Sequence, residues 1–255
     1  MTASSLGKVY LVGAGPGAAD LITVRGMRLL AQADIVFYDA LVQPEMLTYC
    51  PQAEQIAVGK RCDQASTQQR FINKMLVDAA RKHACVVRLK GGDPMLFGRA
   101  QEELAELTAA GVVCEVVPGV TAALAASADA GVSLTSRGLA RNVLFATARV
   151  GQGESPADWV APVVAADTAV LYMGVKQAAE VAAALLAGGM RADRPLMIVE
   201  NASLPTSRQW QLTLAELADV AGWNLSGPAI LMIGEVYRAA AAIRVSEDKC
   251  WSNVA

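Results

Sequence analysis

A short stretch in the first half of the chain, Gly91-Gly-Asp-Pro94, combines two glycines with a carboxylate. It follows the apolar, β-prone run Cys85-Val-Val-Arg-Leu89, which predicts a buried strand, and it precedes a Glu-rich segment, 97–110, which predicts a helix. Glycine lets a ligand approach the backbone closely, and open α/β sheets bind ligands outside the carboxyl ends of their strands. The stretch therefore indicates a ligand site built from backbone groups and Asp93. An ordinary tight connection between strand and helix is the alternative.

A second glycine-rich turn, Gly13-Ala-Gly-Pro-Gly17, has the context of a dinucleotide-binding fingerprint. It follows one predicted strand and opens a predicted helix, and Asp39 ends the next strand, where a ribose-binding acid can stand. Two residues weaken this interpretation. Pro16 lacks the amide that a phosphate-binding turn uses, and Ala18 occupies the third glycine position. A plain glycine-rich strand-to-helix turn is the alternative.

The composition of the chain excludes several classes of function. The 255 residues are 54% hydrophobic with a net charge of −2, which gives no bulk attraction for nucleic acid or an anionic membrane. No apolar run reaches the roughly 20 residues of a membrane-spanning helix, and the N-terminus lacks the apolar core of a signal peptide. The single histidine, His83, supports neither a Ser-His-Asp enzyme nor a multi-histidine metal site, so we expect no metal. Five cysteines without a CxxC pair indicate reduced thiols in a cytoplasmic protein.

Strands and helices alternate along the chain, which predicts α/β domains and, in the first half, a largely parallel sheet. The first half is expected to hold strands at 8–12, 35–38, 56–58, 85–89 and 112–117, and helices at 21–33, 66–80 and 97–110. The second half is expected to hold helices at 120–130, 176–187 and 213–221, and strands at 143–147, 168–173, 195–200 and 228–234. Because Pro118-Gly119 punctuates the chain, we expect an N-terminal α/β domain, 1–118, a C-terminal α/β domain, 119–245, and a polar tail, 246–255. A ligand cleft is expected between the two domains.

A series of short motifs runs in one order from about residue 8 to residue 238. They are Val12-Gly-Ala-Gly-Pro-Gly17, Tyr38-Asp-Ala-Leu-Val42, Val58-Gly-Lys-Arg61, Arg88-Leu-Lys-Gly-Gly-Asp-Pro94, Phe97-Gly-Arg99, Val117-Pro-Gly-Val-Thr-Ala122, Leu134-Thr-Ser-Arg137, Leu171-Tyr-Met-Gly174, Val199-Glu-Asn201 and Pro228-Ala-Ile230. Each motif alone is weak, but the ordered series is specific. The chain closely resembles the tetrapyrrole (corrin/porphyrin) methylase family, and within it the S-adenosylmethionine-dependent uroporphyrinogen-III C-methyltransferases.

The resemblance implies two αβα domains, usually in a homodimer, with S-adenosyl-L-methionine bound in the cleft between them. It implies that uroporphyrinogen III is methylated at C-2 and C-7, giving precorrin-2 via precorrin-1 and S-adenosyl-L-homocysteine as the second product. Precorrin-2 leads to sirohaem, cobalamin or haem d1. The resemblance also implies that the turn at 13–17 is not a Rossmann fingerprint. A methylase of a later corrin intermediate and a non-catalytic binder of cofactor or tetrapyrrole are the alternatives.

Individual site residues follow from the resemblance. The implied cofactor contacts are Pro16, Gly91, Gly92, Asp93, Leu96, Thr121, Ala122, Met173, Ala202 and Ala229. These assignments are physically reasonable, because a carboxylate at position 93 can accept hydrogen bonds from ribose hydroxyls and a methionine offers a soft apolar wall. For Leu96 and Met173 plain core packing is the alternative.

The implied catalytic residues are Asp39, Lys60, Arg99 and Glu102. Asp39 matches the proton acceptor of the family and Lys60 the proton donor, and the other two match residues at the substrate. A strand-end cap is the alternative for Asp39, and an exposed i,i+3 ion pair for Arg99 with Glu102.

Uroporphyrinogen III is a polycarboxylate, so its pocket needs cations. Basic residues at predicted loop or strand-end positions are Lys60, Arg61, Arg99, Arg137, Arg141 and Arg149. The chain departs from the family pattern at Ala100-Gln101, Ser136, Arg149 and Ala202. These departures bear on kinetics and regiochemistry rather than on the cofactor motif.

Overall fold

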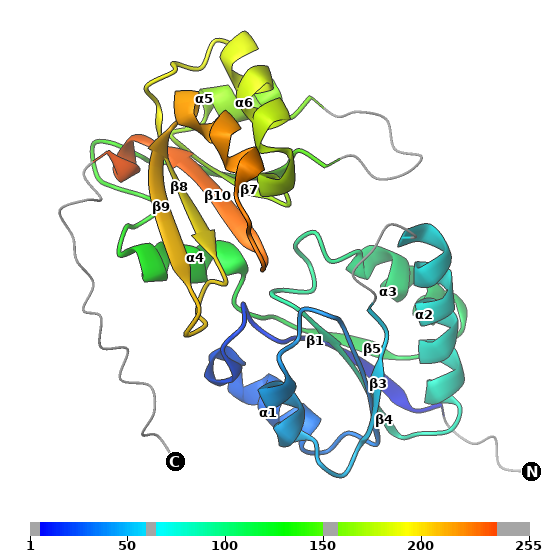
Figure 1. Ribbon diagram of the computed structural model, residues 1–255. Coiled ribbons are helices and arrows are strands. Elements are labelled where there is room, and N and C mark those ends of the chain that lie inside the picture. The colour runs from blue at the N-terminus through cyan, green and yellow to red at the C-terminus, as the bar shows by residue number, and fades with distance from the viewer. Residues whose placement is uncertain (1–5, 60–64, 150–157, 239–255) are drawn as a thin grey trace, which may run out of the picture. The chain divides into compact units, whose positions relative to one another are not determined.

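The computed structural model describes residues 6–59, 65–149 and 158–238 of the chain. The chain divides into two compact units, Met1–Ala122 and Ala123–Ala255. Each unit contains its own five-stranded sheet (Figure 1). Over the described ranges, none of the helices has the length and apolar character that crossing a membrane requires.

The sheet of the first unit is entirely parallel, as the alternation of strands and helices predicts. Its strands are β1 (Lys8–Gly13), β2 (Ile35–Tyr38), β3 (Glu54–Ala57), β4 (Cys85–Lys90) and β5 (Cys114–Val117). They lie in the order β3-β2-β4-β1-β5. Because all of them run in one direction, the turns that follow them meet at the same edge of the sheet.

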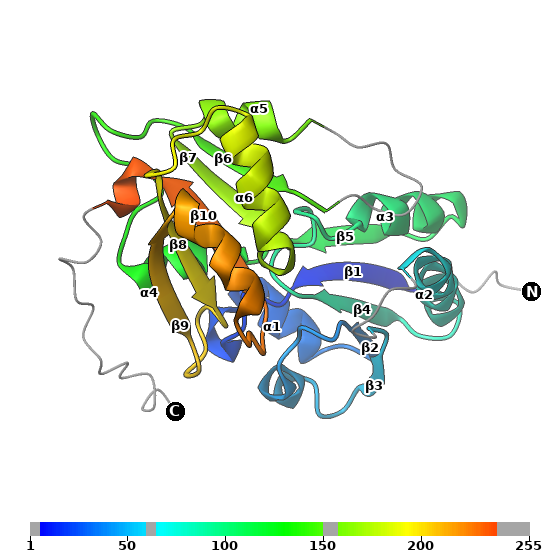
Figure 2. The same cartoon turned by 45° about the horizontal axis from the view of Figure 1, so that its top comes forward.

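Helices cover both faces of this sheet. On one face α1 (Val24–Leu30) and the 3₁₀ segments η1 (Ala19–Leu21) and η2 (Pro44–Tyr49) pack on a core that includes Val12, Val36 and Leu89. On the other face α2 (Ala65–Ala80) and α3 (Ala100–Ala109) lie side by side over Leu11, Phe37 and Val86 (Figure 1, Figure 2). Side chains alternate along a strand, so positions 88 and 90 of β4 share the α2–α3 face with Val86.

The sheet of the second unit is mixed. Its strands are β6 (Val143–Thr147), β7 (Thr168–Tyr172), β8 (Pro195–Glu200), β9 (Arg208–Thr213) and β10 (Ala229–Gly234), in the order β6-β7-β10-β8-β9. β6 and β7 pair in parallel, whereas β10 runs antiparallel to both of its neighbours and β9 antiparallel to β8. Its helical segments are α4 (Ala122–Ala130), α5 (Val160–Ala165), η3 (Val175–Gln177), α6 (Ala178–Ala187), η4 (Leu214–Gly222) and η5 (Glu235–Tyr237). The core of the unit lies between the sheet and α5, α6 and η4, around Leu171, Leu185 and Leu217.

Several predicted boundaries are wrong for identifiable reasons. The helix predicted over 97–110 begins only at Ala100, because Phe97 and Arg99 adopt φ values of 52° and 55°, outside the helical region. The helix predicted over 21–33 is the shorter α1, because the extended Thr23 caps it by accepting a 3.1 Å hydrogen bond from the Gly26 amide. The segment predicted as a helix over 213–221 is the 3₁₀ segment η4. The elements that no predicted helix or strand overlaps include η2, α5, β9 and η5.

Candidate active site

Three glycine-containing turns meet at the carboxyl edge of the first sheet. The Gly15 amide donates to the Gly92 carbonyl at 3.2 Å, and the Gly92 amide donates back to Gly15 at 2.7 Å. Both glycines have positive φ, 82° and 67°, a conformation that costs glycine little. The Gly119 amide donates to Asp93 Oδ2 at 2.9 Å, and the Met95 amide donates to Oδ1 at 2.8 Å. Asp93 therefore ties the turn after β4 to the turn after β5.

The structure gathers the predicted cofactor contacts of the first unit in these turns. Pro16 follows β1, the run 91–93 and Leu96 follow β4, and Thr121 and Ala122 follow β5. A Cβ built on Gly92 would meet no atom within 4 Å. The backbone at this position is therefore open to close approach by a ligand.

The predicted contacts of the second unit gather at one edge of the second sheet. Met173 follows β7, Ala202 follows β8, and Ala229 begins the antiparallel strand β10 between them. Ala229 lies opposite Glu200 in the sheet, and the Asn201 amide donates to the Pro228 carbonyl at 2.9 Å. Met173 has φ 58° and is half exposed, so the core-packing alternative does not hold for it.

A cavity of about 250 Å³ opens at the carboxyl ends of β2, β3 and β4 in the first unit. Its lining residues are Asp39, Val58, Gly59, Gln69, Ile72, Arg88, Lys90, Phe97, Gly98 and Arg99. Two predicted catalytic residues, Asp39 and Arg99, thus line one cavity, and the third, Glu102, binds Arg99. The fourth, Lys60, lies outside the described residues, as does Arg61.

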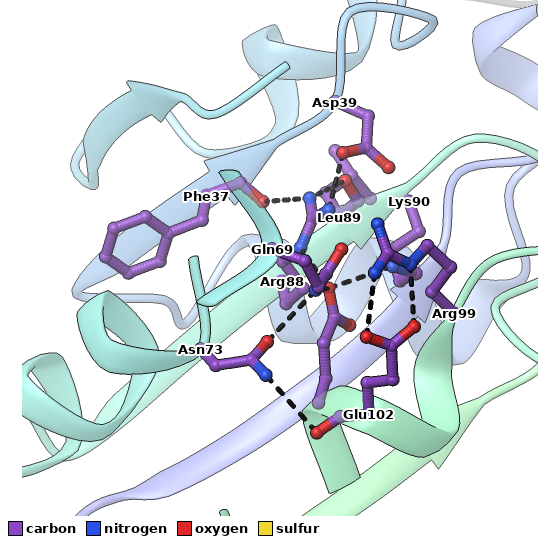
Figure 3. A network of polar contacts seen from close by, with 10 residues as sticks. Phe37, Asp39, Gln69, Asn73, Arg88, Leu89, Lys90, Arg99 and Glu102 are labelled. Atoms are coloured by element: carbon purple, nitrogen blue, oxygen red, sulfur yellow. Dashed lines mark hydrogen bonds and ion pairs between the residues drawn. The ribbon is translucent and has the colours of Figure 1, made fainter. Parts of the chain in front are cut away.

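Buried charged side chains line this cavity and contact one another. Figure 3 shows these polar contacts. We define the charge network as Asp39, Arg88, Lys90, Glu103 and Gln69. Arg88 Nη2 donates to Asp39 Oδ1, and Arg88 Nε donates to Glu103 Oε1 at 3.1 Å. Lys90 Nζ and Gln69 Nε2 each donate to the same Glu103 oxygen at 3.0 Å. Arg88 and Glu103 are 2% and 0% exposed. Four members of the network are thus buried, and Asp39, whose side chain is 29% exposed, is the member that reaches solvent.

The fold explains why these charges are buried. Positions 88 and 90 of β4 face α2 and α3, and Glu103 in α3 supplies the carboxylate that two buried cations require. Burial, followed by the neighbouring Arg88, lowers the pKa of Lys90, while Glu103 and Asp39 act in the opposite direction. Burying these charges costs desolvation free energy, and the contacts among them fix the positions of the side chains at the cavity wall.

Arg99 and Glu102 form a two-pronged ion pair beside the cavity. Arg99 Nε lies 2.6 Å from Glu102 Oε1, and Arg99 Nη2 lies 2.8 Å from Oε2. This contact with Arg99 lowers the pKa of Glu102. The two side chains are 39% and 50% exposed, so the pair contributes little to stability.

Sequence reasoning missed Arg88, Lys90, Glu103 and Gln69 as site residues. The available signal was a pair of cations at alternate positions of a strand whose other residues are apolar. The predicted cations Arg137, Arg141 and Arg149 belong to the second unit, whereas every residue lining this cavity comes from the first.

The sequence profile of the Tetrapyrrole (Corrin/Porphyrin) Methylases matches residues 8–218. The chain belongs to the tetrapyrrole methylase family. This confirms the membership predicted from the ordered motifs. The matched region of the methylase contains the glycine turns, the cavity and the charge network.

Several relatives of the methylase cover most of its length. The chain is 48% identical over 233 residues to the uroporphyrinogen-III C-methyltransferase of Pseudomonas aeruginosa, covering 91% of this chain and 95% of that protein. It is 44% identical over 232 residues to a siroheme synthase of Pseudomonas putida, covering 90% of this chain but 50% of that protein. The chain thus spans about half the length of the siroheme synthase.

Solved structures share the fold. The native uroporphyrin III C-methyl transferase of Thermus thermophilus has 41% identity and a TM-score of 0.80, covering 91% of this chain and 100% of that chain. A second structure of the T. thermophilus enzyme, complexed with S-adenyl homocysteine, gives the same values. A cobalt precorrin-4 methyltransferase has 30% identity and a TM-score of 0.79, covering 90% of this chain and 95% of that chain. These likenesses confirm the predicted α/β methylase fold.

Proposed function

We propose that the chain is an S-adenosyl-L-methionine-dependent C-methyltransferase that methylates uroporphyrinogen III at C-2 and C-7, giving precorrin-2 via precorrin-1. The observation that carries this proposal is the cavity in which Asp39 and Arg99 stand beside the buried cations Arg88 and Lys90. The 48% identity to a uroporphyrinogen-III C-methyltransferase along nearly the whole of both chains supports the same substrate.

The turns at the edge of the first sheet fit the cofactor. Gly92 has open space where a Cβ would stand, and Asp93 sits beside it with two acceptor oxygens. We propose that Pro16, Gly91, Gly92, Asp93, Leu96, Thr121 and Ala122 hold S-adenosyl-L-methionine, with Met173, Ala202 and Ala229 contributing from the second unit. The bound cofactor would supply an activated methyl group, and its demethylated product is S-adenosyl-L-homocysteine.

Proton transfer is the step that the residues of the chain must assist. When a pyrrole carbon of the substrate gains a methyl group, a proton must leave a neighbouring carbon. We propose that the Asp39 carboxylate accepts it. One oxygen of Asp39 is held by Arg88, and the other has no hydrogen-bond donor among the described residues. Lys60 is proposed as a proton donor on the basis of the family resemblance.

Charge complementarity between Arg99 and the carboxylates of uroporphyrinogen III supports the proposed substrate. Arg99 lines the cavity and is half exposed, so it can exchange Glu102 for an acidic side chain of the substrate at modest cost. The bound carboxylates would align the macrocycle, and alignment contributes much of the rate enhancement for such a reaction.

Assembly and location are inferred from the same relationship. We infer that the enzyme is a homodimer and acts in the cytoplasm. Its product would feed sirohaem, cobalamin or haem d1 synthesis, and the likeness to one half of the siroheme synthase is consistent with the first of these.

The decisive experiment is an anaerobic assay with S-adenosyl-L-methionine and freshly reduced uroporphyrinogen III, followed by absorbance and mass. We expect a product heavier by two methyl groups. A product with one methyl group would contradict the assigned double methylation. Binding of S-adenosyl-L-homocysteine without any methylation of this substrate would favour a methylase of a later corrin intermediate.

A further inference from the structure

The guanidinium of Arg88 bridges the two carboxylates of the charge network (Figure 3). Its Nη2 donates to Asp39 and its Nε to Glu103, while its Nη1 donates to the backbone carbonyls of Phe37 at 3.5 Å and Leu89 at 3.2 Å. Every nitrogen of the side chain is therefore engaged, and the side chain is 2% exposed. A planar group held at all three nitrogens has a fixed position and a fixed orientation.

The Asp39 carboxylate has fewer contacts than the Arg88 guanidinium. It is the first residue after β2, and its amide donates to Leu89 at 3.2 Å, which fixes the backbone but not the carboxylate. Its side chain is 29% exposed and lines the cavity. Among the described residues Arg88 is the one donor that holds the carboxylate.

Glu103 in turn holds Arg88. One oxygen of Glu103 accepts from Arg88, Lys90 and Gln69 together, and the residue is fully buried. Within the part of the chain that the structure describes, Glu103 is the one fully buried carboxylate that pairs with these two cations. Arg88 and Lys90 carry two positive charges, and Glu103 balances one of them. Asp39 balances the other, so the Arg88–Asp39 contact makes the network neutral.

We propose that Arg88 is a positioning residue, which orients the Asp39 carboxylate toward the cavity while Glu103 holds Arg88 in place. This inference rests on the proposed function, in which Asp39 accepts the proton. Arg88 itself contacts neither proton nor methyl group in this scheme and acts only through Asp39.

Arg88→Lys tests the proposal because lysine keeps the charge but has no fork to join Asp39 to Glu103. We expect kcat to fall about 10- to 100-fold, with the KM for S-adenosyl-L-methionine within about twofold of wild type. The crystal structure of the variant should show the Asp39 carboxylate released from its present orientation. An unmoved Asp39 would overturn the proposal independently of activity.

A double-mutant cycle separates positioning from a general structural effect. If Arg88 acts through Asp39, combining Arg88→Lys with Asp39→Asn should be no slower than Asp39→Asn alone. Multiplicative losses would mean that Arg88 acts by another route, and the proposal would be wrong. The matched control is Arg194→Lys, since Arg194 is also partly buried and bonded to backbone carbonyls, but belongs to the second unit and is not among the residues that line the cavity. Its kcat should stay at the wild-type value.

Glu103→Gln provides a second test if Arg88→Lys does not fold. We expect Glu103→Gln to lower kcat, but by a smaller factor than Asp39→Asn does. Adding Glu103→Gln to Asp39→Asn should not lower kcat further. The two possible failures are distinguishable. Full turnover by Asp39→Asn alone would refute the proposed role of Asp39. Lost turnover by Asp39→Asn together with normal turnover by Arg88→Lys would refute only the present inference.

Discussion

Gly119 lies against Gly92 so closely that a Cβ on Gly119 would stand 2.3 Å from the Gly92 carbonyl oxygen. The same Cβ would lie 2.8 Å from the Cα of Gly13. The turns after β1, β4 and β5 can therefore meet only while position 119 carries no side chain. Glycines from three motifs that lie far apart in the sequence thus pack directly against one another.

Gly119→Ala should separate these turns. We expect it to lower the free energy of unfolding by about 1–3 kcal/mol, because backbone must move to relieve the overlap, and to weaken binding of S-adenosyl-L-homocysteine. Urea denaturation followed by circular dichroism and titration calorimetry would measure the two effects. Gly222→Ala is the control, since a Cβ there would meet nothing within 4 Å. Equal stability of the two variants would show that the turns tolerate separation.

Asp39→Asn should remove the proton acceptor while leaving its shape in place. We expect kcat to fall by about 10²- to 10⁴-fold, with the affinity for S-adenosyl-L-homocysteine unchanged. Steady-state methylation of uroporphyrinogen III and calorimetry would report the two quantities. Asp20→Asn, at an exposed site of the first unit that does not line the cavity, should behave as wild type. Wild-type turnover by Asp39→Asn would contradict our assignment.

Arg99→Ala should affect substrate binding far more than stability. The lost ion pair is exposed, so the free energy of unfolding should change by less than about 1 kcal/mol. Loss of one charged hydrogen bond to a substrate carboxylate should raise the KM for uroporphyrinogen III about 10- to 100-fold. Arg191→Ala removes a comparable two-pronged pair, with Asp193 in the second unit, and should leave KM unaltered. A KM that rises equally in both variants would indicate a general effect of charge.

Glu200 should make the second unit sensitive to acid. Burial opposes its charge, but the Gly227 amide and the Arg208 guanidinium outweigh this effect, and the pKa of Glu200 lies below its ordinary value. A carboxyl group with a lowered pKa stabilises the fold fully above its unfolded pKa of about 4.3, and this contribution is lost as the pH falls through the folded pKa.

Glu200→Gln should therefore be less stable than wild type by about 1–3 kcal/mol at pH 7, and the difference should shrink as the pH falls below about 4.3. Denaturation curves between pH 7 and pH 3, followed by tryptophan fluorescence, would measure it, since Trp210 and Trp223 lie in this unit. A difference that stays constant over this range would show that Glu200 is not stabilised as a carboxylate.

Much of the fold could be predicted because its strands are short apolar runs bounded by glycine, proline or aspartate. β2, β6 and β8 have the predicted bounds. β9, with the sequence Arg-Gln-Trp-Gln-Leu-Thr, was missed although Trp210 and Leu212 alternate with polar residues, because it is an edge strand and these two residues are its only apolar ones. The start of α3 was misplaced because Phe97 and Arg99 adopt left-handed conformations that their residue types do not indicate.

Site residues could be predicted from the sequence only where they belong to one of the ordered family motifs. Asp39 and Arg99 were found through the order of motifs, and the cavity brings them together. The predicted strand 85–89 includes Arg88 but ends before Lys90, and the cost of burying a cation argues against a buried site for either residue unless a partner is known. Their partner, Glu103, comes from a helix whose packing on β4 no local pattern reveals. The contacts of Arg88 and Lys90 with Glu103 are therefore visible only in the tertiary structure.

The central position of β1 has a consequence for how the chain folds as it is synthesised. β1 is synthesised before the other strands of its sheet, but its partners are β4, with Lys8 opposite Cys85, and β5, with Val9 opposite Cys114. Neither edge of β1 can be paired until most of the first unit has emerged. Such distant pairings slow folding and leave strand edges open to misassociation. The nascent chain should therefore depend on chaperones until about residue 117, and truncations that end before β5 should aggregate.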